Sequence, residues 1–269
     1  MPTPRTLLLT GAAGGLGTLM RSLLPEYGYT LRLFDVRPVE GEPDAITADL
    51  SDKEALREAV HGVDAVLHLA GISLEAPFEK ILRSNIEGTY NLYEAAREAG
   101  VPRIVFASSN HAVGYTPAPR AGAPLIPVDT PHRPDTFYGL SKSFGEDLAQ
   151  LYWDRHGLET VSVRIGSCFG EPADVRMLSV WMSPADGARL FHAALTAEEV
   201  GHTVVYGSSA NTRLWWDLTS ARALGYDPRD DSEQYAGKLI AEHGELDPEN
   251  PAHTHLGGRF VNDPPIWPY

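Results

Sequence analysis

The sequence has 269 residues, a formal net charge of −14 and a hydrophobic fraction of 43%. This length allows one sizeable buried core, alone or with a small lobe, and the composition is that of an ordinary globular protein. The acidic balance argues against nucleic acids and anionic membrane surfaces as partners. No apolar run is long enough to span a bilayer or resembles a signal peptide. A single cysteine, Cys168, excludes an internal disulfide, so we expect a cytoplasmic protein.

Short apolar runs alternate with helical patterns in the first part of the chain. The runs predict strands at residues 7–9, 31–35, 64–69, 103–107 and 160–165. Apolar residues at helical spacing predict helices at residues 15–26, 52–60, 78–99 and 137–156. Strands that are separated by helices pair in parallel. The pattern therefore predicts an α/β protein with a Rossmann-type, doubly wound parallel sheet.

The pattern changes after the last of these strands. Residues 166–183 show no regular periodicity, and a helix opening at Ser183-Pro184 and a strand at 203–206 follow. The last thirty or so residues are rich in Pro, Gly and His and only weakly periodic. We predict a single domain over residues 1–269, with a dinucleotide-binding core in 1–165 and a small substrate lobe mainly in 166–269.

A glycine-rich turn joins the first predicted strand to the first predicted helix. Glycines allow a tight turn and a close approach of the backbone to a pyrophosphate, and the helix start offers free N–H groups and a positive dipole end. The alternative is a tight turn without a ligand. The residues that we assign to dinucleotide binding here are Gly11, Gly14, Gly15, Leu16 and Gly17.

Asp35 ends the second predicted strand, eighteen residues after Gly17. A carboxylate at this place can accept hydrogen bonds from the ribose hydroxyls of NAD and would repel the 2′-phosphate of NADP. Arg37 is a competing signal, because it could pair with that phosphate, and Asp35 could also be a solvated loop acid. We give Asp35 more weight because it is nearer the strand end, and we predict NAD as the cofactor.

Two further segments are candidates for contacts with the cofactor. Asp49 could hold the adenine amino group with Leu50 against the ring, or the pair could be an ordinary helix-capping region. After the strand at 64–69, small residues would let the cofactor pass over the sheet edge. We assign Leu69, Ala70 and Gly71 to this role.

The candidate catalytic residues are Tyr138 and Lys142, four residues apart on one helical face. A nearby ammonium would stabilise a tyrosine phenolate, which could then act as a base. Alone, such a pair is usually a solvated helix face. Ser109, Asn110 and His111 follow the strand at 103–107, at the sheet edge where ligands bind in open α/β folds. The alternative for this cluster is a turn that closes the strand.

Together these motifs resemble the extended short-chain dehydrogenase/reductase superfamily over roughly residues 5–170. A narrower resemblance, to the uronate dehydrogenase family, runs along nearly the whole chain. It rests on the segments 68–73, 108–111, 164–168, 176–179, 215–217 and 257–261. The resemblance implies NAD-dependent oxidation of glucuronate or galacturonate at C1, which gives the aldarolactone.

The same resemblance implies roles for individual residues. Tyr138 would be the general base, and Lys142 would bind the nicotinamide ribose and tune Tyr138. Cys168 would lie against the nicotinamide. Sugar hydroxyls would be held by Ser73, Ser109, Asn110 and His111, and the carboxylate end by Ser167 and Arg176. The superfamily also implies a homo-oligomer, with helices 78–99 and 137–156 as candidate interface surfaces.

Arg176 fits a hexuronic acid independently, because a planar guanidinium can bind a carboxylate through two parallel hydrogen bonds. The alternative is a surface arginine that pairs with Glu171 or Asp174. The histidines form no convincing metal set. Rival functions are a sugar-nucleotide epimerase or dehydratase with tightly held NAD, a non-catalytic NAD-sensing regulator, and a dehydrogenase for a neutral aldose.

Overall fold

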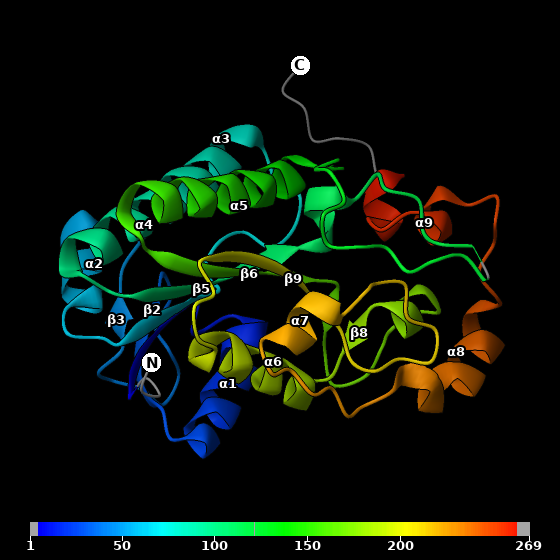
Figure 1. The fold of residues 1–269 in the computed structure, drawn as a ribbon, viewed down its shortest axis with the longest axis horizontal. Coiled ribbons are helices and arrows are strands. Elements are labelled where there is room, and N and C mark those ends of the chain that lie inside the picture. The colour runs from blue at the N-terminus through cyan, green and yellow to red at the C-terminus, as the bar shows by residue number, and fades with distance from the viewer. Residues whose placement is uncertain (1–4, 121, 263–269) are drawn as a thin grey trace.

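The computed structural model describes residues 5–120 and 122–262, and it is built around a seven-stranded sheet (Figure 1). Neighbouring strands pair in parallel in the order β3-β2-β1-β4-β5-β6-β9, which confirms the predicted Rossmann-type fold. The strands are β1 (Thr6–Thr10), β2 (Thr30–Asp35), β3 (Ile46–Thr47), β4 (Ala65–His68), β5 (Arg103–Ser109), β6 (Glu159–Ile165) and β9 (His202–Gly207). The order reverses between β1 and β4, the place where ligands bind in such sheets.

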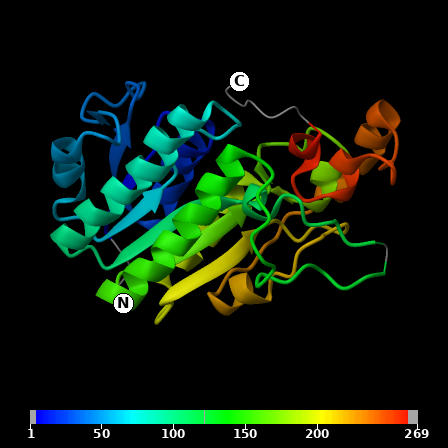
Figure 2. The same ribbon diagram turned by 90° about the horizontal axis from the view of Figure 1, so that it is seen from above.

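Helices cover both faces of the sheet (Figures 1 and 2). One face carries α2 (Lys53–Val60), α4 (Gly88–Ala99) and α5 (Phe137–His156), and the other carries α1 (Gly15–Leu23) and α6 (Pro184–Thr196). The remaining helices are α3 (Phe78–Ile81), α7 (Thr219–Ala223), α8 (Ala236–His243) and α9 (Pro251–Thr254). Single helical turns are η1 (Leu24–Tyr27), η2 (Leu82–Glu87), η3 (Asn110–Val113), η4 (Arg176–Ser179), η5 (Ser232–Tyr235) and η6 (Gly258–Val261).

The apolar runs are continuous because the central strands are buried on both faces. In β1, Leu7 and Leu9 pack in the core on the α1 and α6 side, whereas Leu8 packs in the core under α2 and α4. All three side chains are fully buried. This packing of helices on both faces of the sheet fixes the carboxyl ends of β1, β4 and β5 side by side. These ends form the edge that carries the candidate site.

Helix boundaries follow their capping residues. Asp52 caps α2 by accepting a hydrogen bond from Ala55 N, and Ser183 caps α6 in the same way through Asp186 N. The predicted helix 78–99 is helical throughout, but its segment η2 is a π-helix. The strand predicted at 103–107 extends to Ser109 as β5.

The part of the chain after β6 is more structured than its periodicity indicates. The two-residue strands β7 (Ser167–Cys168) and β8 (Trp181–Met182) pair in parallel within the segment predicted to be irregular. The helices α7 and α8, which the sequence analysis did not predict, follow β9. Among the described residues, no helix has the length and apolar character that a bilayer span requires.

The C-terminal segment folds back onto the loop between β5 and α5 (Figure 2). Ala118 N donates to Thr254 O at 2.8 Å, and Gly257 N donates to Gly114 O at 2.9 Å. Leu256 is fully buried in a separate apolar cluster that includes Trp216. Residues 254–261 are thereby placed beside the polar ends of the central strands.

Candidate active site

The glycine-rich turn between β1 and α1 has the backbone that a phosphate-binding loop needs. Gly11 adopts a φ of +74°, which favours glycine. A methyl group at Gly17 would lie 2.1 Å from Gly11 O, so the helix packs against the turn at this position only without a side chain. Gly14 caps α1 without a side-chain hydrogen bond, and the space around Gly15 is open. The helix start therefore offers backbone N–H groups to an anion, which fits the pyrophosphate of a dinucleotide.

Asp35 lies beside this turn and is buried. Its carboxylate accepts hydrogen bonds from Ala13 N and Arg37 N, both at 2.9 Å. Arg37 Nη2 donates to Ala13 O at 2.8 Å, and its Nε lies 3.7 Å from Asp35 Oδ1. Arg37, the competing signal for NADP, thus contacts the same turn and also Asp35.

The end of β4 is tied to β1 through a buried histidine. Thr10 Oγ1 lies 2.8 Å from His68 Nδ1 and accepts from Ala70 N at 3.2 Å, and His68 Nε2 lies 3.3 Å from Thr89 Oγ1. Burial, with a smaller contribution from the Lys142 charge, lowers the pKa of His68 to about 3. His68 is therefore neutral near pH 7, and Thr10, which it contacts, holds Ala70 N next to the glycine turn.

Tyr138 and Lys142 lie in the first two turns of α5, and both are buried. Lys142 Nζ donates to Ala107 O at 2.8 Å and lies 5.5 Å from the centre of the Tyr138 ring. Burial raises the pKa of Tyr138 to about 12, although a hydrogen bond with the Ser109 side chain lowers it. Burial also lowers the pKa of Lys142 to about 8, opposed by the charge of Glu146. The expected tyrosine, lysine and serine are thus gathered at the end of β5.

Arg176 lies in η4 and reaches the C-terminal segment. Its Nη2 donates to the carbonyl of Leu256, and its Nε is buried without a hydrogen-bond partner in the described part of the chain. Asn110 Nδ2 donates to the same carbonyl. Burial lowers the pKa of Arg176 to about 10, opposed by the charges of Asp174 and Asp135. The alternative of a surface pair is not observed, since Glu171 pairs with Lys238 at 3.9 Å and Asp174 Oδ1 accepts from Met177 N at 2.7 Å.

The remaining residues that were predicted for the site lie in different parts of the fold. Ser73 is exposed after β4, Ser167 Oγ is buried without a partner among the described residues, and Cys168 lies in the core. Burial raises the pKa of the Cys168 thiol to about 12. Asp49 Oδ1 accepts from Ser51 N at 2.8 Å, as the helix-capping alternative requires, and Leu50 is buried.

Three buried acidic or amide side chains near the site were not predicted. Asp135 contacts His111, and Asn85 Nδ2 donates to Ile72 O and to Ser141 Oγ, at 2.9 and 3.0 Å. Glu146 lies one turn after Lys142. Asn85 and Glu146 lie in helix patterns, where an amide or an acid resembles a solvated polar position, and Asp135 lies in the loop before α5. Only the tertiary contacts reveal these residues.

Glu146 is the centre of a buried polar network below Lys142. Its carboxylate accepts three hydrogen bonds from Arg164, at 2.8, 3.0 and 3.2 Å, and one at 2.5 Å from Ser108 Oγ. It also lies 2.8 Å from His132 Nε2. Burial alone would raise the pKa of Glu146, but the contacts with His132, Arg164 and Ser108 lower it to about 2. The network joins β5, β6 and α5 beneath the candidate catalytic residues Tyr138 and Lys142.

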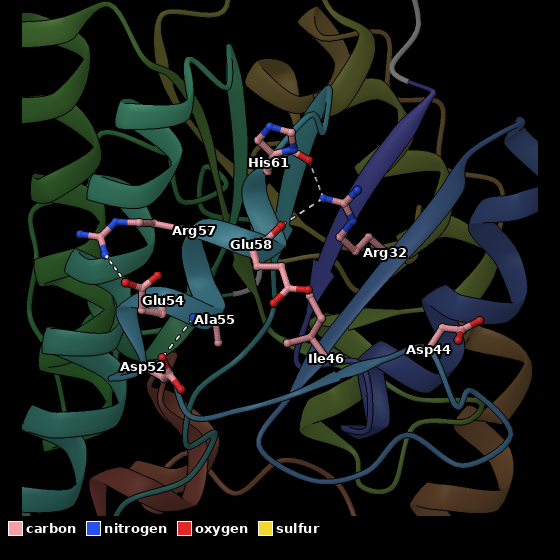
Figure 3. Close-up of a pocket in the computed structure, with 9 residues that line it drawn as sticks. All are labelled: Arg32, Asp44, Ile46, Asp52, Glu54, Ala55, Arg57, Glu58 and His61. Carbon is pink, nitrogen blue, oxygen red and sulfur yellow. Dashed lines mark hydrogen bonds and ion pairs between the residues drawn. The ribbon is translucent and has the colours of Figure 1, made fainter.

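A surface groove between β2, β3 and α2 contains none of the predicted site residues (Figure 3). Arg32 Nη1 donates there to the carbonyl oxygens of His61 and Ala59, at 2.6 and 3.0 Å. The guanidinium thus binds the carboxyl end of α2, where a cation is favoured by the helix dipole. Among the described residues, no group of histidine, cysteine and acidic side chains is arranged to hold a metal ion.

The chain is similar to named proteins along nearly its whole length. The uronate dehydrogenase of Pseudomonas syringae pv. tomato is 49% identical over 97% of this chain and 94% of its own length. A crystal structure of uronate dehydrogenase from Agrobacterium tumefaciens is 46% identical, with a TM-score of 0.90 and coverage of 97% of each chain. A mutant of that enzyme complexed with NAD matches at 45% identity and a TM-score of 0.90, covering 97% of this chain and 98% of its own. A family model matches residues 7–217, and the chain therefore belongs to the NAD-dependent epimerase/dehydratase family.

Proposed function

We propose that this protein oxidises a hexuronic acid, glucuronate or galacturonate, at C1 with NAD and releases the aldarolactone. The observation that carries the substrate is Arg176, a cation with a buried, unpartnered Nε and no carboxylate partner among the described residues. Such a guanidinium is suited to a carboxylate ligand. The relatives that carry the name uronate dehydrogenase, at 46–49% identity, support the same substrate class.

The side chains at the end of β5 fit an oxidation at C1. Bound NAD would supply the hydride acceptor. Tyr138 would take the proton of the anomeric hydroxyl, and Lys142, whose Nζ lies 5.5 Å from the tyrosine ring, would stabilise the phenolate when it carries its charge. Ser109, hydrogen-bonded to Tyr138, would share the negative charge that develops on the sugar oxygen.

The remaining assignments follow the position of each residue. Gly11, Asp35 and Ala70 would border the dinucleotide, as would the other residues predicted for this side, Gly14, Gly15, Leu16, Gly17, Asp49, Leu50, Leu69, Gly71 and Cys168. Asn110, His111, Ser73 and Ser167 would hold the sugar. Residues 166–269 would mainly form a small substrate lobe, which contributes Ser167 and Arg176.

We also propose a homo-oligomer that works in the cytoplasm. Large apolar side chains are exposed on α4 and α5, namely Tyr90, Leu140, Leu151 and Trp153, which supports the oligomer. The only cysteine of the sequence is buried, which supports the cytoplasm. An apolar surface on two adjacent helices suits contact with a second copy. Light scattering of the purified protein would test this, and a monomer at micromolar concentration would contradict it.

The test of the activity is the initial rate of NADH formation by the purified protein. Glucuronate and galacturonate should each give NADH with NAD, whereas glucose with NAD, and either uronate with NADP, should give far lower rates. NADH from glucose at the uronate rate would overturn the substrate. Retained NAD binding without NADH from any free sugar would overturn the reaction and favour an epimerase, which forms no net NADH.

A further inference from the structure

Asp135 lies just before the first turn of α5, and its side chain is fully buried. Its Oδ2 is 2.7 Å from His111 Nδ1, and its Oδ1 accepts a hydrogen bond from Thr136 Oγ1 at 3.0 Å. His111 is a predicted substrate contact in η3, twenty-four positions earlier in the chain. The loop between β5 and α5 therefore brings the carboxylate of Asp135 back to the imidazole of His111, which lies just after the end of β5.

Three glycines enclose this carboxylate. A methyl group at Gly114 would lie 2.0 Å from Asp135 Oδ2, and one at Gly257 would lie 1.9 Å from the same atom. A methyl group at Gly139 would lie 3.0 Å from Asp135 Oδ1 and 2.3 Å from His111 O. Three separate segments thus omit a side chain where the carboxylate sits, so its position is closely defined.

Aromatic rings fix His111 on other sides. Phe260, in η6, stacks on the imidazole with ring centres 4.4 Å apart and an angle of 26° between the planes. Tyr138 meets the imidazole edge-on at 5.6 Å and 62°. The His111 side chain is 14% exposed. Both the plane of the ring and the rotation about its axis are therefore set before a substrate arrives.

The chemistry of the pair decides where the imidazole proton lies. An ionised carboxylate only accepts hydrogen bonds, so His111 Nδ1 must carry a hydrogen. In the neutral ring the other nitrogen, Nε2, is then an acceptor. Within residues 5–120 and 122–262 the ring makes its hydrogen bond through Nδ1, and none is made through Nε2. A sugar hydroxyl is a donor of the kind that such an atom binds.

We propose that Asp135 is a positioning residue that keeps a proton on His111 Nδ1, so that Nε2 is left to accept a hydrogen bond from a substrate hydroxyl when the ring is neutral. The role of the hydroxyl rests on the proposed function, whereas the tautomer does not. Arg176 would bind the carboxylate of the sugar while His111 binds a hydroxyl. Arg176 and His111 would thus orient the substrate from two points.

The near-isosteric variant Asp135→Asn tests the kinetic role, with Asp129→Asn, an exposed acid of the same loop, as the matched control. We expect the KM for the uronate to rise by about 2- to 10-fold, the loss expected for one hydrogen bond between neutral groups, with kcat and the Kd for NAD nearly unchanged. In a His111→Gln background the same substitution should add little, because its effect passes through the imidazole. An unchanged KM, or additive effects of the two substitutions, would overturn the proposal.

Nitrogen-15 NMR of the histidine side chains tests the tautomer without turnover, with the His111→Gln spectrum to assign the signals. In the wild-type protein, at a pH where the ring is neutral, Nδ1 should be protonated and Nε2 should have the shift of an unprotonated nitrogen. Asp135→Asn should shift the ring toward the other tautomer. Protonation on Nε2 in the wild type would overturn the inference even if uronates are oxidised. If no sugar is oxidised, the proposed function fails while the NMR result still decides the tautomer. The wild-type spectrum alone is decisive if the variant does not fold.

Discussion

The proposed cofactor side and the proposed substrate side of the site are built differently. On the cofactor side, the glycine turn and Asp35 follow directly from neighbouring parallel strands, in which Thr10 is paired with Phe34. Short local hydrogen bonds, such as that from Ala13 N to Asp35, complete this side. On the substrate side, the side chains come from η3, η4 and α5, and the carbonyl of Leu256 receives both Asn110 and Arg176.

The two sides therefore depend on different interactions. The cofactor side is held by the sheet, whose strands are buried on both faces and whose register places the turn and the acid together. The substrate side is held by polar contacts between segments that are far apart in the sequence, up to 146 residues for Asn110 and Leu256. Changes on the substrate side should therefore alter turnover and sugar binding while NAD binding persists.

The largest difference between the effect on turnover and the effect on NAD binding is expected for Tyr138→Phe. Loss of the phenol removes the proton acceptor, so kcat should fall by roughly 10²- to 10⁴-fold. The Kd for NAD, measured by calorimetry, should stay within about twofold of the wild type because the ring remains in place. A variant with full activity would remove Tyr138 from the mechanism.

Arg164→Met tests the buried network beneath Tyr138 and Lys142. The substitution leaves Glu146 buried without its bidentate partner, so the free energy of unfolding should fall by about 3–5 kcal/mol in urea melts. Arg213→Met is the matched control, because Arg213 pairs with Glu233 nearer the surface, at 2.8 Å, where a pair is worth about 0–1 kcal/mol. Equal losses in the two variants would contradict a special role for the buried pair.

Arg176→Met should impair only the substrate side. Methionine fills much of the same space without charge, so the KM for uronates should rise by about 10- to 100-fold, with NAD affinity unchanged. The ratio of kcat/KM for glucuronate to that for glucose should fall accordingly. An unchanged ratio would exclude Arg176 as the carboxylate contact.

The smallest effect concerns pH. Tyr138 and Lys142, with pKa values of about 12 and about 8, both hold a proton near pH 7, and the pair must lose one before the phenolate can stand beside the ammonium. Below pH 8, kcat/KM for oxidation should therefore rise by about tenfold per pH unit and level off above it. Lys142→Arg, which keeps its charge, should move the rise to higher pH. The same midpoint in that variant would contradict the coupling.

The fold was largely predictable from sequence because its signals are local. Apolar runs mark the buried strands, and Ser183 followed by proline marks the start of α6. The π-helix η2 was missed because apolar spacing does not distinguish it from an α-helix over so few residues. The strands β7 and β8 have two residues each, too few for any periodicity.

The candidate site divides in the same way. Gly11, Asp35, Tyr138 and Lys142 could be found because each lies at a fixed offset from a strand or helix. Asp135 could not, since its partners are glycines and a histidine that only the folded chain brings to it. Sequence spacing thus locates groups on one element, and it misses carboxylates that act through contacts between elements.

The carbonyl of Leu256 has a practical consequence for producing this protein. The glycine turn, Asp35 and the sheet make no hydrogen bond with residues 250–262 among those described. A preparation clipped by a protease before Leu256 should still bind NAD, although Asn110 and Arg176 have lost their shared acceptor. Cofactor titration would then count every molecule as intact, so active-site concentration should be measured by turnover and the mass of the chain verified.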